Sequence, residues 1–206
     1  WGISMDGNVH RIDPANNVVT DLFSQILKRE VPIKDYIITS KGDLWLWGDQ
    51  GCIHLSYSAN RKDLKSEHFT RSETLPDNRI HFIHEDCEGK IWIGTKKGLV
   101  RIHNSPSDMR LVSQYLDGLS VKSVLEVGDQ LFFGTYSSGL RCYDRAEGGF
   151  RSFPLINEHL ETHPIYCMYA LDSARLLLGS SQYIFDVNPG GMQVARSFHS
   201  SIDSVR

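Results

Sequence analysis

The chain has 206 residues and a formal net charge of −3, with 40% hydrophobic and 23% charged residues, a composition typical of a globular protein with a substantial core. Lysine and arginine form no cluster along the sequence, which excludes the basic surface that nucleic-acid binding by this segment would need. No apolar run reaches the roughly 18 residues needed to cross a bilayer, and the four cysteines include no CxxC pair, so zinc and redox motifs are not indicated.

Short apolar stretches separated by turn residues recur along the whole chain. They alternate with polar residues or run apolar over four to six positions, which predicts strands rather than helices. In chain order, the predicted units are a partial one at 1–27, four complete ones at 34–70, 79–116, 121–153 and 164–198, and the first strand of another at 201–206.

The unit at 79–116 shows the pattern most clearly. Its apolar stretches near Phe82, Trp92 and Val100 predict three strands, and a more polar fourth stretch predicts an outer strand that faces solvent. Tight turns are expected at Asp86–Gly89 and Lys96–Gly98. Each unit is therefore expected to form a small four-stranded antiparallel sheet.

The second turn of each unit recurs with a period of about 44 residues, which is typical of a propeller blade. It falls at Gly7, Gly51, Gly98, Gly139 and Tyr183. The sequence thus predicts an all-β fold, a single β-propeller segment over 1–206. Trp47 stands where other units end their second strand with glycine, and it could either pack between blades or offer an aromatic platform to a ligand.

One unit also carries a family pattern. From Asp86 to Arg101 the sequence reads D-x-x-G-x-[IL]-W-I-G-T-x-x-G-L-x-R. This resembles the two-component-regulator propeller repeat, which builds the sensor region of hybrid two-component systems in Bacteroides-type bacteria. The pattern is less complete in the units containing Trp45 and Phe132, and least complete in the last, where Leu177 replaces the aromatic residue.

The resemblance implies an extracytoplasmic, periplasmic sensor region of an inner-membrane histidine kinase. Such parent proteins carry two seven-bladed propellers and a small β-sandwich outside the membrane, and their usual ligands are oligosaccharides. The expected partners are therefore an oligosaccharide, the neighbouring propeller and β-sandwich domains of the parent chain, and a second copy of the parent. The sequence has no phospho-acceptor histidine motif and no nucleotide-binding glycine box, so we expect no enzyme activity, catalytic residue, cofactor or metal in this segment.

The ends of the chain leave two arrangements open. The stretch at 201–206 could pair with the N-terminal strands and close a five-bladed ring. The family resemblance instead favours an arc cut from a seven-bladed ring.

The candidate ligand-binding residues lie in two kinds of connection. In a propeller, the links between blades and the turns between second and third strands share one face around the central channel. Those segments contain Asp49, Gln50, Asp77, Asn78, Arg79, Lys96, Lys97, Tyr136, Ser137 and Gln182. Polar groups with a few aromatic rings suit hydrogen bonding and stacking to a sugar, so we predict that a ligand binds there.

Two other functions compete with ligand sensing. One is a structural or protein-docking propeller without a small ligand. The other is a glycan hydrolase or lyase, for which Asp77, Asp117 and Glu161 are the candidate carboxylates, although such residues more commonly cap turns. His81 and His84 lie three residues apart on a predicted strand, which places them on opposite faces and argues against a shared metal.

Overall fold

The computed structural model describes most of the chain. The described residues are 2–3, 9–13, 15–16, 18–21, 33–57, 64–71, 74–102, 111–160, 163–191 and 193–199. Gly7, Glu161 and the predicted strand at 201–206 lie outside them.

Five antiparallel sheets follow one another along the chain, and within each the strands are paired in sequence order. The first sheet has three strands, β1 (Gly2–Ile3), β2 (Val9–Asp13) and β3 (Val18–Asp21). The second has β4 (Asp35–Ile38), β5 (Leu44–Gly48), β6 (Gly51–Tyr57) and β7 (Leu64–Phe69). The third has β8 (Ile80–Glu85), β9 (Ile91–Thr95), β10 (Gly98–Ile102) and β11 (Leu111–Tyr115). The fourth has β12 (Val121–Val127), β13 (Gln130–Thr135), β14 (Leu140–Asp144) and β15 (Gly149–Ser152). The fifth has β16 (Cys167–Ala170), β17 (Leu176–Gly179), β18 (Tyr183–Asn188) and β19 (Gln193–His199).

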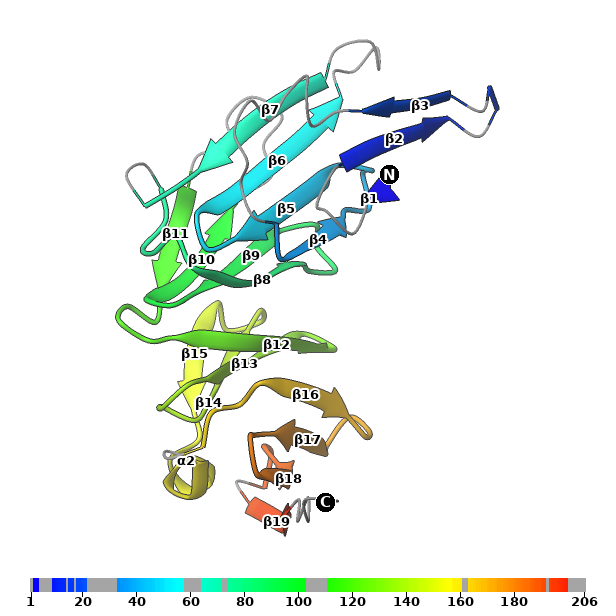
Figure 1. Cartoon of the computed structure of the whole chain (residues 1–206). Coiled ribbons are helices and arrows are strands. Elements are labelled where there is room, and N and C mark those ends of the chain that lie inside the picture. Colours follow the sequence, from blue (N-terminus) through cyan, green and yellow to red (C-terminus); the bar gives the residue numbers. More distant parts are fainter. Residues whose placement is uncertain are drawn as a thin grey trace, which may run out of the picture.

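The sheets are arranged like the blades of a fan (Figure 1). The first strands of successive sheets, β4, β8, β12 and β16, are neighbours in space, as the inner strands of a propeller should be. Among the described residues no strand of one blade pairs with a strand of another. The predicted all-β propeller of four-stranded antiparallel blades, four of them complete, is confirmed.

Apolar side chains fill the space between neighbouring blades from the sheet β4–β7 onward. Trp47 and Ile93 belong to the cluster between the sheets β4–β7 and β8–β11. Trp92 and Phe133 belong to the next cluster, and Phe132 and Leu178 to the last. Trp47 is buried in the first of these clusters, so it packs between blades and offers no platform to a ligand.

Two glycines have conformations or contacts that explain why glycine recurs at the turns and strand ends of the blades. Gly139 lies in the turn before β14 with φ of 67°, a left-handed conformation that other residues adopt at a cost. Gly94 lies in β9 against the ring of Phe82, and a Cβ there would stand only 2.1 Å from a ring carbon. Blade packing therefore requires glycine at the end of this strand.

A helix interrupts the strand pattern in one connection between blades. The helix α2 (Pro154–Leu160) follows β15 and buries Ile156 and Leu160 in the cluster between the last two blades. Asn157 on the same helix accepts a hydrogen bond from Leu140 N at 2.7 Å and donates one to Leu140 O at 3.1 Å. No helix in the described parts of the chain is long and apolar enough to cross a membrane.

Candidate functional site

The links between blades and the turns between second and third strands meet on one face of the fan. Gly51 N donates to Asn78 O at 2.8 Å, Lys96 N to Arg79 O at 3.0 Å, and Tyr136 N to Ser120 O at 2.9 Å. These main-chain bonds join the turn after a blade's second strand to a link between blades, which is the following link for Gly51 and the preceding link for Lys96 and Tyr136. We call this surface, formed by residues 49–50, 74–79, 96–97, 116–120 and 136–139, the turn face.

Four cations gather on the turn face where three blades meet. Lys34 precedes β4, Arg79 precedes β8, Lys96 follows β9, and Lys122 lies in β12. We call these four residues the cationic cluster.

One carboxylate, Asp49, faces part of the cationic cluster. Its Oδ1 lies 2.7 Å from Lys34 Nζ and 3.6 Å from Arg79 Nε. The hydrogen bond from Lys34 is the main reason that the pKa of Asp49 lies below its ordinary value. Asp49 therefore neutralises one edge of the cluster.

Lys122 is held differently. Its Nζ lies 3.1 Å from His81 Nε2 and 5.5 Å from the centre of the Tyr136 ring. Burial lowers the pKa of Lys122, and the charges of Arg79, Lys34 and Lys96 lower it further. No carboxylate in the described part of the chain lies within ion-pair distance of Lys122. It is a half-buried positive charge surrounded by other positive charges.

His81 is kept neutral by the same surroundings. Burial lowers the pKa of His81 to about 4, and the charge of Lys122 contributes next. A neutral imidazole has one ring nitrogen that accepts and one that donates. Because Nε2 faces the ammonium of Lys122 and also lies 3.2 Å from Ser120 Oγ, we assign the accepting role to Nε2 and the proton to Nδ1.

Two equivalent β-bulges aim these side chains. The pairing of β8 with β9 skips His81, because Ile80 pairs with Thr95 and Phe82 with Gly94. The pairing of β12 with β13 skips Lys122 in the same way. A bulge adds an unpaired residue and redirects its side chain, and bulges are common beside functional sites.

The bulge also corrects one prediction. His81 contacts Ser120 and Lys122, and His84 lies 3.1 Å from Glu126, so both histidines face the blade that contains β12. The prediction of opposite faces is wrong, because the extra residue at His81 interrupts the alternation of side chains. The two rings contact opposite ends of β12.

The structure brings some of the predicted site residues together and uses others to shape turns. Asp49, Arg79, Lys96 and Tyr136 belong to or border the cationic cluster. Gln50 and Lys97 are exposed in the turns beside it.

The remaining predicted residues have other surroundings. Asp77 Oδ1 accepts a bond from Arg79 N at 2.9 Å, and Asn78 Oδ1 accepts one from Arg71 N at 2.5 Å, so both shape the link. Ser137 lines an open pocket of about 580 Å³ beside α2. Gln182 lies in the corresponding turn of the last blade. Their roles in binding stay predictions.

Sequence reasoning missed Lys34, His81, Ser120 and Lys122. All four lie in or beside the first strand of a blade, whereas the predicted ligand-binding residues come from the links and the turns. One signal existed, since Ile80-His81 and Val121-Lys122 are equivalent pairs in the repeat. In a regular strand, side-chain alternation alone does not predict that His81 and Lys122 contact each other.

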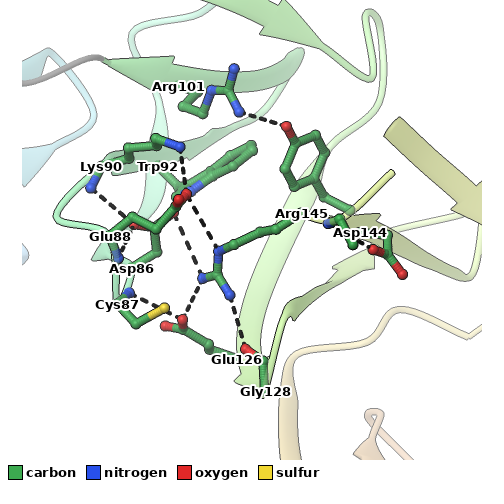
Figure 2. A network of polar contacts seen from close by, with 12 residues as sticks. Asp86, Cys87, Glu88, Lys90, Trp92, Arg101, Glu126, Gly128, Asp144 and Arg145 are labelled. Atoms are coloured by element: carbon green, nitrogen blue, oxygen red, sulfur yellow. Dashed lines mark hydrogen bonds and ion pairs between the residues drawn. The ribbon is translucent and has the colours of Figure 1, made fainter. Parts of the chain in front are cut away.

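A second polar network lies between two blades at the other end of their strands (Figure 2). Its centre is Arg145, which forms an ion pair with Glu126, lies 3.8 Å from Asp86 Oδ2, and donates to Gly128 O at 2.9 Å. The side chains of Arg145 and Asp86 are only 9% and 1% exposed. The network thus joins the blade β8–β11 to the blade β12–β15.

Asp86 organises the turn that its sequence pattern predicted. Its Oδ1 accepts bonds from Glu88 N and Lys90 N at 3.0 and 2.9 Å, and its Oδ2 accepts one from Trp92 Nε1 at 2.8 Å. Above the Trp92 ring lies the guanidinium of Arg101, 5.4 Å from the ring centre. The charges in this network are compensated within it, so we assign it a structural role.

The cysteines do not contribute to either cluster as a metal or redox site. All four thiols are free, and Cys52 and Cys142 are buried while Cys87 and Cys167 are exposed. In the described residues no group of three or more histidine, cysteine, aspartate or glutamate side chains is placed to hold a metal ion.

Comparison with known proteins gives structural but not sequence relatives. No family model matches the chain, and no curated protein matches it. The extracellular domain of the hybrid two-component system BT4673 from B. thetaiotaomicron matches 81% of this chain with a TM-score of 0.60 and 21% identity. The corresponding domain of BT3049 from the same organism matches 83% with a TM-score of 0.56 and 21% identity. YCF48 from Cyanidioschyzon merolae matches 91% of the chain and 65% of its own, with a TM-score of 0.58 and 14% identity.

The chain spans 22% of the length of each of the two Bacteroides structures. At this identity the likeness concerns the fold. The chain is a β-propeller segment with the fold found in the extracellular domains of Bacteroides hybrid two-component systems.

Proposed function

We propose that this chain is a segment of an extracytoplasmic sensor propeller and that its turn face binds a carbohydrate. The observation that carries the proposal is the convergence of the cationic cluster, the Ser120 hydroxyl and the Tyr136 ring from three blades onto one place. Tyr136 is 51% exposed. Hydrogen-bond donors beside an exposed aromatic ring are what a sugar-binding site requires.

The fold supports the rest of this proposal. Two of the solved structures that share this fold are extracellular domains of hybrid two-component systems, which supports a role in the periplasmic part of an inner-membrane protein whose kinase lies outside these residues. Binding would act on signalling through a difference in affinity between two arrangements of the sensor.

The exposed outer face of the last blade supports the proposal that further domains pack against it. On the sheet β16–β19, one face packs on the previous blade, while Tyr169 and Ile184 on the other face are 65% and 45% exposed. A further blade would cover these side chains, which favours an arc of a seven-bladed ring. The same face supports the second candidate function, a docking propeller whose partners are the neighbouring propeller, the β-sandwich or a second copy of the parent.

Isothermal titration of the full chain against a panel of neutral and acidic oligosaccharides tests the proposal. We expect at least one to bind, and we expect Tyr136→Ala to weaken that binding. Tyr169→Ala, which removes an exposed ring on the outer face of the last blade, should leave the binding unchanged. Failure of every oligosaccharide to bind would favour the docking propeller instead.

A further inference from the structure

The cationic cluster contains positive charge that no carboxylate among the described residues neutralises. Asp49 already contacts Lys34 and Arg79, at 2.7 and 3.6 Å. Among the described residues no carboxylate lies within ion-pair distance of Lys96 or Lys122. The charges that act on Lys122 are those of Arg79, Lys34 and Lys96, all of the same sign. An unpaired cation that is half-buried among like charges is unfavourable without a counterion.

The fold maintains this arrangement with specific local structure. Lys122 is the unpaired residue of a bulge, and the equivalent bulge places His81 against it. A charged imidazole at this distance would add a further positive charge, whereas the neutral ring accepts a bond from the ammonium at 3.1 Å. His81 therefore positions Lys122 without neutralising it.

We infer that the cationic cluster binds the anionic group, a carboxylate or a sulfate, of an acidic saccharide. An anion beside Lys122 and Lys96 would relieve the repulsion among the cations and gain charge-assisted hydrogen bonds. This inference rests on the proposed function and names the ligand class of the same site.

Two observations favour a saccharide over an acidic protein segment. The donors converge from three blades onto one point instead of following a strand edge along which a peptide could lie. Ser120 Oγ and the exposed ring of Tyr136 lie beside that point, where they can contact sugar hydroxyls and a sugar face. An inorganic anion such as sulfate would contact only the lysines and neither Ser120 nor Tyr136.

The test compares two disaccharides that differ at C6, where one carries a carboxylate and the other a neutral hydroxymethyl group. The full chain is titrated with digalacturonic acid, with its neutral counterpart galactobiose, and with inorganic sulfate. We expect digalacturonic acid to bind roughly 10- to 100-fold more tightly than galactobiose, the range for hydrogen bonds to a charged group. Sulfate should bind more weakly than the acidic disaccharide and compete with it.

Lysine variants test whether the preference for the acidic disaccharide arises from the cationic cluster. Lys122→Met should remove the preference for the acidic disaccharide, Lys122→Arg should retain most of it, and Lys41→Met, an exposed lysine in the turn between β4 and β5, should leave it unchanged. Thermal unfolding of each variant verifies that the fold is intact. We expect no loss of stability in Lys122→Met, because the substitution removes a cation crowded by other cations.

The possible results distinguish a failure of the acidic-saccharide site from a failure of carbohydrate binding in general. Equal affinity for the acidic and neutral disaccharides would overturn the inference and leave carbohydrate binding standing. An acidic preference that survives Lys122→Met would overturn the assignment to this cluster. Absence of binding by either disaccharide would overturn the inference, and the proposed function would be overturned as well if the whole panel of oligosaccharides failed to bind. Loss of the preference in Lys122→Met but not in Lys41→Met would support both.

Discussion

Replacement of Arg145 by methionine should destabilise the protein by about 2–4 kcal/mol. Arg145 is 9% exposed and lies between Glu126, which is 20% exposed, and Asp86, which is 1% exposed. Without the guanidinium these two carboxylates would lose the counter-charge that they share. Breaking a buried ion pair by removing one partner costs about 3–5 kcal/mol, and because water reaches Glu126 we lower the expected cost to about 2–4 kcal/mol.

Urea unfolding followed by tryptophan fluorescence measures this cost, because Trp92 donates to Asp86 within the network. With a slope of about 1–3 kcal/mol per molar urea, the midpoint should fall by about 1–2 M. The double variant Arg145→Met/Glu126→Gln should recover part of the loss, since it removes one of the stranded charges. A cost below about 1 kcal/mol for Arg145→Met, or strictly additive effects in the double variant, would refute the view that this network joins the two blades.

Three further changes have defined outcomes. Gly94→Ala should destabilise by about 1–3 kcal/mol in urea unfolding, because the new methyl overlaps the Phe82 ring; an unchanged midpoint would mean that the ring moves freely. Trp92→Phe should destabilise the protein by about 1–3 kcal/mol, because it leaves Asp86 Oδ2 without its buried donor. If the free-energy losses of Trp92→Phe and Asp86→Asn add in full in the double variant, this cause is contradicted. Burial opposes ionisation of Glu126, but bonds from Cys87, Arg145 and His84 lower its pKa to about 2. A depressed carboxyl pKa contributes stability that is present above about pH 4.5 and lost as the pH falls toward 2. Glu126→Gln should therefore make the stability depend less on pH over that window, as followed by fluorescence during acid unfolding. An unchanged acid-unfolding profile would argue against the low pKa.

The fold could be predicted because each blade repeats the same local rules. Turn glycines such as Gly98 and Gly139, and the apolar stretches around Trp92 and Phe133, are local signals that do not depend on contacts between blades. The helix α2 was not predicted, because its seven residues are too few to show a helical period and its burial depends on the blades on either side.

The candidate site could be predicted only in part, for a geometric reason. Asp49, Arg79 and Lys96 lie in turns, where polar residues are expected to face solvent and ligands. His81 and Lys122 lie within strands, and their direction is set by bulges that appear only in the pairing register. The sequence also contains no sign that the lysine at 34 lies near the lysine at 122, because their proximity arises from the packing of three blades.

Protection of lysines from chemical labelling tests whether the cationic cluster on the turn face binds an acidic saccharide. The full chain is labelled with an amine-reactive reagent with and without saturating acidic oligosaccharide, and each lysine is quantified by mass spectrometry. We expect Lys34, Lys96 and Lys122 of the cationic cluster to become protected, while Lys41 and Lys65 outside it label at the same rate with and without the saccharide. Unchanged labelling of the three, or protection confined to Lys41 and Lys65, would contradict a saccharide site on the turn face.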